Sequence, residues 1–140
     1  MALPSFSAIG IAGTGLTVYR KWLDAVSDNI ANINNASPTS ASAFQARYIQ
    51  AQSVTDSQTG DGAGVQVARA VLSGNATGRV VYEPANPLAD AQGNVRYPDI
   101  DLGSQMVQMM MAQRGYQANL AVVDRAKESY EAALQLGRNT

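Results

Sequence analysis

The sequence predicts a mainly α fold in which long N- and C-terminal helices form a coiled coil, with a small β-rich insert between them. At both ends of the 140-residue chain, apolar residues recur at spacings that alternate between three and four. This spacing lets one helix lie along another. The stretch between the two ends is rich in Gly, Ser, Thr and Pro, which is typical of strands and turns. A lone amphipathic helix has nothing in water against which to bury its apolar stripe, so the two ends are expected to meet each other or other chains.

The N-terminal helix is expected within residues 1–36, which form the first predicted domain, an axial helix. Ser5 or Ser7 can cap its start, because a hydroxyl accepts a hydrogen bond from an unpaired N–H of the first turn. Pro38 lies beyond its end and cannot continue the helical hydrogen bonds. The apolar seam of this helix is predicted at Ile9, Ala12, Leu16, Tyr19, Leu23, Val26, Ile30 and Ile33.

The second predicted domain, residues 37–98, is a β-rich insert followed by an extended linker. Runs of β-branched and aromatic residues predict strands at Arg47–Val54, Val65–Leu72 and Arg79–Tyr82, separated by glycine-containing turns. Three prolines between residues 84 and 98 predict that the linker is extended, because proline is unsuited to a helix interior or a central strand.

The C-terminal axial helix is expected within residues 99–140, the third predicted domain. It should open at Asp99 or Asp101, where a carboxylate can cap the first N–H groups, and end at Gly137. Gly115 lies in its middle and costs about 1 kcal/mol relative to Ala, which predicts the close approach of a neighbour. The predicted seam is Leu102, Met106, Met109, Gln113, Tyr116, Leu120, Val123, Lys127, Tyr130 and Leu134.

Composition excludes several classes of function. Ten Lys and Arg against eleven Asp and Glu give a net charge of -1 without a basic patch, so we expect no nucleic-acid partner. The chain has no Cys and no His, which removes disulfides, thiolate or imidazole zinc sites and Ser-His-Asp catalysis. No uncharged apolar run is long enough to span a bilayer, and the N-terminus does not resemble a cleaved secretory signal. We expect no membrane span.

Three motifs have both a functional and a structural interpretation. The segment Gly10–Gly15 resembles a phosphate-binding loop, but no strand precedes it. The favoured interpretation is that its small residues allow close helix packing. Asp99 and Asp101 could share a hard cation, yet capping of a helix is the favoured role. The methionines at 106, 109, 110 and 111 are either an adaptable binding surface or packing filler. We therefore expect no catalytic, cofactor-binding or metal-ligating residues.

Six segments from the two ends of the chain resemble one family of structural proteins. Four C-terminal segments resemble the C-terminal helix of bacterial flagellar basal-body rod proteins: Tyr97–Leu102, Met106-Val107, Arg114–Asn119 and Leu136–Arg138. Near the start of the chain, Ile11–Leu16 and Asn29–Asn32 are similar to the N-terminal region of the same family.

The linker narrows this resemblance to one type of rod protein. Tyr82–Asp90, Gly93–Val95 and Tyr97-Pro98 resemble the proximal-rod members of the family more closely than the others. The segment Ser37–Arg47 departs from the family, because it is rich in Ala and Ser where more basic, turn-rich residues are expected.

The resemblance implies a mechanical function. Such a chain would be a structural subunit of the proximal rod, which builds a helical tube and transmits torque across the periplasm. Its partners would be other flagellar rod proteins, copies of itself and the flagellar type III export apparatus, which exports subunits without a cleaved signal. The residues expected at the assembly interface, where the two seams face each other, are Leu16, Tyr19, Leu23, Val26, Ile30, Tyr116, Leu120, Val123, Tyr130 and Leu134.

Two other functions remain open from the sequence. A discrete coiled-coil adaptor or export chaperone would carry the same apolar stripes but would not polymerise as its concentration rises. An enzyme that cleaves cell-wall glycan through paired carboxylates is weakly supported, because no two acidic residues form a recognisable catalytic pattern.

Overall fold

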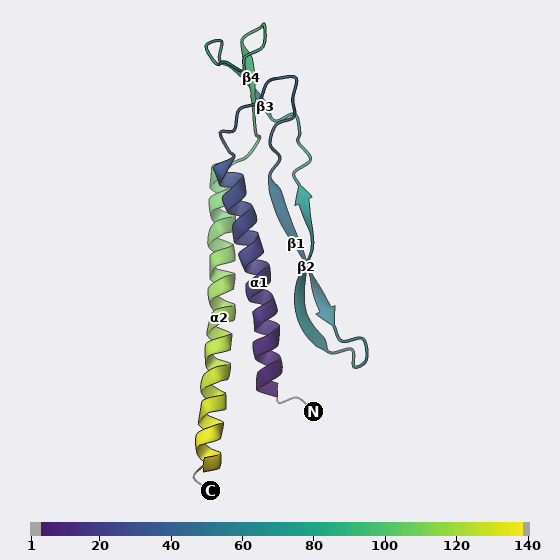
Figure 1. Ribbon diagram of the computed structural model, residues 1–140, viewed down its shortest axis with the longest axis vertical. Coiled ribbons are helices and arrows are strands. Elements are labelled where there is room, and N and C mark those ends of the chain that lie inside the picture. The colour runs from purple at the N-terminus through teal and green to yellow at the C-terminus, as the bar shows by residue number, and fades with distance from the viewer. Residues whose placement is uncertain (1–3, 139–140) are drawn as a thin grey trace. The chain divides into compact units, whose positions relative to one another are not determined.

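The computed structural model describes residues 4–138, which form two helices and four strands (Figure 1). In chain order these elements are α1 (Pro4–Ala31), β1 (Arg47–Thr55), β2 (Gly62–Leu72), β3 (Arg79–Tyr82), β4 (Asn94–Tyr97) and α2 (Leu102–Arg138). The first three and last two residues of the predicted terminal domains lie outside the described part, and the three-domain division itself stays a prediction.

The chain forms two compact units, each assembled from separate stretches of sequence. Unit 1 comprises Met1–Lys21, Gln50–Arg69 and Met111–Thr140. Unit 2 comprises Trp22–Ile49 and Ala70–Met110. We describe each unit by itself.

The predicted coiled coil is wrong, and so is the mainly α class. The strands form two separate two-stranded sheets, β1 with β2 and β3 with β4, beside the two terminal helices. The prediction placed each residue of the three-four spacing on the face where the two helices meet. Leu120 and Leu134 are instead 43% and 51% exposed, while small or polar residues such as Ala112 are buried.

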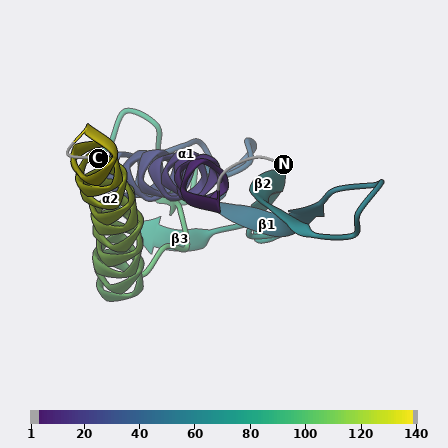
Figure 2. The same cartoon turned by 90° about the horizontal axis from the view of Figure 1, so that it is seen from below.

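In unit 1, α1 lies between α2 and the β1–β2 hairpin, as both views show (Figures 1 and 2). The buried apolar residues here include Ala12, Val18 and Ala112, which are small enough to let the helices approach closely. The hairpin turns at Gly60, whose φ of 77° favours glycine. Its amide donates to the carbonyl of Asp56 at 2.9 Å, which closes the turn.

Unit 2 is organised around the β3–β4 hairpin. The strands are antiparallel, with Arg79 opposite Tyr97 and Tyr82 opposite Asn94. Val95 is fully buried, and its unit also buries Val26 and two alanines from the segment before β1. Close packing requires a glycine at position 78, because a Cβ there would lie 2.7 Å from the Cβ of Ala43.

The sequence did not predict the fourth strand, β4, because residues 94–97 fall in the segment assigned to the extended linker. The loop before β4 is closed by Asp90, whose carboxylate accepts the backbone N–H groups of Gln92 and Asn94, both at 2.9 Å. This closure brings β4 back alongside β3. Proline spacing alone did not reveal it, because the turn is made by a side chain.

The three predicted strands and the helix cap are confirmed. β1, β2 and β3 overlap the predicted segments with shifts of three residues or fewer at any end. The carboxylate of Asp101 accepts the backbone N–H of Ser104 at 2.6 Å, so Asp101 caps α2 as expected. Asp99 has a different role, because its carboxylate accepts the Asn75 amide at 2.8 Å.

Candidate assembly interface

The two helices interlock in unit 1 through a reciprocal pair of glycines. Gly15 of α1 lies against Asn119 of α2, where a Cβ on the glycine would be 2.9 Å from Asn119 Cγ. Gly115 of α2 lies against Tyr19 of α1, where a Cβ would be 2.7 Å from Tyr19 Cδ1. Real Cβ atoms essentially never approach within 3.0 Å, so a side chain at either position displaces its neighbour. The close approach predicted at Gly115 is confirmed.

The small-residue segment Gly10–Gly15 also holds the β1–β2 hairpin to α1. The Thr14 hydroxyl donates to the carbonyl of Ile11 at 2.6 Å and accepts the backbone N–H of Val65 at 3.0 Å. Gly64 lies against Thr14 with a φ of 124°, a conformation that a side chain rarely adopts. The favoured interpretation of this motif as close helix packing holds at Gly15, whereas a Cβ at Gly10 or Gly13 would have no atom within 4 Å.

In unit 2, one buried amide joins three elements. Asn29 of α1 has no exposed surface, and its Nδ2 donates to Gln105 Oε1 of α2 at 3.0 Å. The same amide pairs with the backbone of Arg47 in β1, donating to its carbonyl at 2.9 Å and accepting its N–H at 2.7 Å. Because buried polar groups require partners, this network fixes the end of α1 against both neighbours.

The sequence prediction missed Asn29 and Gln105 as packing residues. Each lies one position before a residue of the predicted seam, Ile30 and Met106 respectively. The three-four spacing selects the residues of the seam, so it passes over a buried residue that lies one position away from it. That spacing carries no signal for Asn29 or Gln105.

The ten residues predicted for the assembly interface are not gathered into one buried set. Val26 is buried in unit 2, and Tyr19 contacts Gly115 across the helices of unit 1. The half-buried members are Leu16, Tyr19, Leu23, Ile30, Tyr116 and Val123, and the exposed members are Leu120, Tyr130 and Leu134. The assembly interface therefore stays a prediction.

The first turns of α2 expose large apolar side chains. Leu102–Gln113 contains no charged residue. Four side chains from this stretch that lie in unit 2 are between 45% and 53% exposed: Leu102, Met106, Val107 and Met110. Soluble monomers rarely expose contiguous apolar surface, and such surfaces are typical of contacts with other proteins. Of the two interpretations of the methionines, exposure favours the adaptable binding surface.

Ionised carboxylates stabilise the loop and strands of the β3–β4 hairpin. Hydrogen bonds from Asn86 and the Tyr97 hydroxyl, both at 2.9 Å, lower the pKa of Glu83. The bond to Glu83 raises the pKa of Tyr97. The backbone N–H of Asn94 and the hydroxyl of Thr39 lower the pKa of Asp90. These carboxylates are therefore occupied in holding the hairpin together.

The described residues contain no group of three or more acidic side chains that could hold a metal ion. Over the same range, 4–138, neither helix combines the length and apolar character needed to cross a bilayer.

Comparison with known proteins identifies the family. The family model described as "Flagellar basal body rod FlgEFG protein C-terminal" matches residues 91–136, which include β4 and nearly all of α2. The resemblance to flagellar basal-body rod proteins that the sequence indicated is therefore confirmed for the C-terminal region.

Curated relatives extend the match to almost the whole chain. The flagellar basal-body rod protein FlgC of Salmonella typhimurium strain LT2 is 34% identical over 128 residues, covering 91% of this chain and 94% of the relative. FlgC of Escherichia coli O6:H1 is 36% identical over 130 residues with the same coverage. FlgC of Borreliella burgdorferi is 32% identical over 147 residues, covering 94% and 96%. The chain therefore belongs to the FlgC family of flagellar basal-body rod proteins.

Proposed function

We propose that this chain builds the proximal rod of the flagellar basal body as a structural subunit, joining copies of itself and other rod proteins in a helical tube that transmits torque across the periplasm. Its family makes it a structural rod protein, and the observation that carries the proposal is the match over 91% of the chain to a FlgC relative. The role is mechanical, and the proposal includes no catalytic step and no cofactor. The flagellar type III export apparatus would deliver the subunit without a cleaved signal.

The exposed surface of α2 supports assembly through the helices. Within the subunit, α2 buries Gln105 in unit 2 and Ala112 in unit 1. Apolar side chains on the rest of its surface, including Met106 and Val107, are available to neighbouring subunits. Contacts between unlike surfaces propagate as a helix when the rotation between subunits does not close into a ring. A helix with apolar residues on several faces suits such an assembly.

The predicted interface residues would then divide between two roles. The exposed members, Leu120, Tyr130 and Leu134, would contact neighbouring subunits directly. The half-buried and buried members would hold the two helices in the geometry that presents those exposed side chains.

Replacing Leu120 with Asp should block incorporation into the rod. Leu120 is 43% exposed, so the free subunit should still fold. A neighbouring subunit that excludes water from this position would leave a carboxylate unpaired, at a cost of several kcal/mol. We expect swimming to be lost and the chain to be missing from isolated basal bodies, while its cellular level stays unchanged. Swimming assays and mass spectrometry of basal bodies measure these effects.

Gln117→Glu is the matched control, because it adds the same charge one turn earlier at an exposed polar position. This variant should assemble and swim normally. Normal swimming and incorporation of Leu120→Asp would show that this face of α2 is not an assembly interface.

A further inference from the structure

The register of the β3–β4 hairpin in unit 2 shows which backbone groups of β3 face away from β4. In an antiparallel pair, successive residues of one strand direct their N–H and carbonyl groups alternately toward the other strand and away from it. Just past the end of β3, the N–H of Glu83 donates to the carbonyl of Gly93 at 2.8 Å, so Glu83 faces the opposite strand. Tyr82 and Val80 lie one and three positions before Glu83. Their backbone groups therefore point away from β4.

The far edge of β4 is covered by the chain itself. The N–H of Ser37 donates to the carbonyl of Arg96 at 2.8 Å, and the N–H of Arg96 donates to the carbonyl of Ser37 at 2.9 Å. At Asn94, the carbonyl accepts the N–H of Asp90 at 3.0 Å, and the N–H donates to the Asp90 carboxylate at 2.9 Å. The outward-pointing backbone groups of β4 are therefore paired within the subunit.

The far edge of β3 has no such cover. Among residues 4–138, no hydrogen bond engages the outward backbone groups of Val80 and Tyr82. Their side chains are also 53% and 70% exposed. Natural edge strands are commonly protected by Lys, Pro or a bulge, but β3 contains neither residue and pairs with β4 in an unbroken register. An open edge with exposed apolar side chains suits pairing with another strand.

The strands of the β1–β2 hairpin differ, because each is engaged by α1. The backbone of Arg47 in β1 pairs with the side chain of Asn29. In β2, the N–H of Val65 donates to the Thr14 hydroxyl at 3.0 Å.

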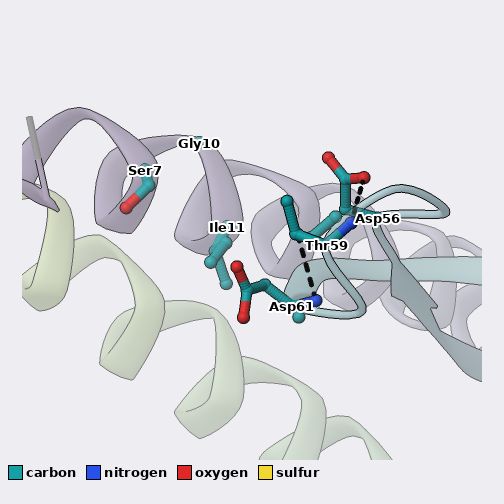
Figure 3. A pocket seen from close by; sticks show the side chains of 8 residues that line it. Ser7, Gly10, Ile11, Asp56, Thr59 and Asp61 are labelled. Atoms are coloured by element: carbon teal, nitrogen blue, oxygen red, sulfur yellow. Dashed lines mark hydrogen bonds between the residues drawn. The ribbon is translucent and has the colours of Figure 1, made fainter. Parts of the chain in front are cut away.

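The turn of the β1–β2 hairpin is closed by its own residues (Figure 3). Asp56 Oδ1 accepts the backbone N–H of Thr59 at 3.2 Å, and the backbone N–H of Asp61 donates to Thr59 Oγ1 at 3.3 Å. These bonds use backbone groups inside the turn. The edge of β3 is therefore the stronger candidate for pairing with another chain.

The strand β3 is complementary to a second copy of itself. When two β3 strands run antiparallel with Val81 at the centre, Val80 of each copy lies opposite Tyr82 of the other. Each of these pairs exchanges hydrogen bonds through its outward backbone groups, and it places an aromatic side chain beside a β-branched one. The same register puts Arg79 of each copy opposite Glu83 of the other, so opposite charges meet at both ends.

Tyr97 holds the two charged side chains in place for this contact. The guanidinium carbon of Arg79 lies 5.4 Å from the centre of the Tyr97 ring. The Tyr97 hydroxyl and the Asn86 amide both donate to Glu83 Oε2, at 2.9 Å each. Among the described residues, no hydrogen bond engages the other oxygen, Oε1, which is thus available to a cation from a second copy.

We propose that two copies of the free chain pair through their β3 strands, antiparallel and centred on Val81, and join the two hairpins into one sheet of order β4–β3–β3–β4. The contact joins identical surfaces, so it closes at two copies. It differs from the contacts between unlike surfaces proposed for the rod, and it belongs to the subunit before assembly. The proposal does not depend on the rod function.

Analytical ultracentrifugation of the purified full chain tests this pairing. We expect a reversible dimer. Val80→Pro should raise its dissociation constant by about tenfold or more, because proline lacks the N–H that reaches the second copy. The bonds to β4 are kept, because this N–H points away from β4. Val80→Thr is the matched control, because it keeps both the N–H and the β-branched shape, so it should still form the dimer. Circular dichroism checks that both variants keep the fold.

Disulfide cross-linking tests the register of the two strands. The chain has no cysteine, so Val80→Cys and Tyr82→Cys each introduce a single thiol. Opposite residues that exchange hydrogen bonds have Cα atoms about 5.5 Å apart, which a disulfide can span, whereas diagonal neighbours are about 7–8 Å apart. An oxidised mixture of the two variants should therefore form mixed covalent dimers about tenfold faster than either variant forms its own dimer. Intact-mass measurement distinguishes the mixed dimers from the others.

Three results would overturn the proposal. The first is a wild-type chain that stays monomeric up to about 100 μM. The second is a dimer that Val80→Pro leaves unchanged, which would place the contact elsewhere on the chain. The third is cross-linking within either single variant as fast as in the mixture, which would indicate parallel strands or another register. None of these results concerns the presence of the chain in basal bodies, so failure of this proposal is distinguishable from failure of the rod function.

Discussion

Replacing Asn29 with Leu should lower the free energy of unfolding of the isolated subunit by about 3 kcal/mol. The substitution removes the amide that pairs with Gln105 Oε1 and with the N–H and carbonyl of Arg47. A buried polar group left without a partner costs about 1–3 kcal/mol. Gln105 Oε1 is such a group, and the N–H and carbonyl of Arg47 are partly buried. The larger apolar side chain recovers part of the loss through burial. Urea unfolding followed by circular dichroism measures the difference.

Asn34→Leu is the matched control, because Asn34 is exposed beyond the end of α1. It should change stability by less than about 0.5 kcal/mol. A double-mutant cycle with Gln105→Ala should give a coupling energy of about 1 kcal/mol or more. An Asn29→Leu subunit as stable as the wild type would show that the amide network does not hold the three elements together.

Replacing Gly115 with Leu should destabilise the subunit by about 2 kcal/mol, although leucine is the better helix former by about 1 kcal/mol. The new Cβ would collide with the ring of Tyr19, and the rest of the side chain would force α1 and α2 apart. We also expect weaker incorporation into the rod. Thermal unfolding of the purified protein and its amount in isolated basal bodies measure the two effects.

Two controls separate crowding from helix propensity. Gly13→Ala should stabilise the subunit by up to about 1 kcal/mol, because a Cβ at that position has no atom within 4 Å, whereas Gly115→Ala should not. Tyr19→Ala should rescue part of the Gly115→Leu defect by removing the ring. Equal gains from Ala at both glycines would contradict the interlocked contact.

Features set by local chemistry could be predicted from the sequence. Asp101 caps α2 because a carboxylate before a helix meets unpaired N–H groups, whatever the rest of the fold. The strands β1, β2 and β3 follow from β-branched and aromatic residues bounded by turn-forming residues. Gly115 indicated a close neighbour because glycine inside a helix has a cost that packing must offset.

Features set by contacts distant in sequence could not be predicted. β4 depends on the loop that Asp90 closes, so its four residues resembled the end of a linker. The buried faces of the helices depend on which side chains fit between closely spaced backbones. Gly15 and Asn29 occupy such positions, while Leu120 is exposed. Apolar periodicity predicts the reverse, because it places Leu120 on the buried face and leaves Gly15 and Asn29 off it.

The most direct test of the central claim, that the chain is a rod subunit assembled through the exposed faces of its helices, is electron cryo-microscopy of isolated basal bodies. We expect density for this chain in the rod, in several copies related by a helical operation. Leu120 and Leu134, now about half exposed, should be covered by neighbouring subunits. A rod without this chain, a discrete complex outside the rod, or copies whose Leu120 and Leu134 face solvent would contradict the claim.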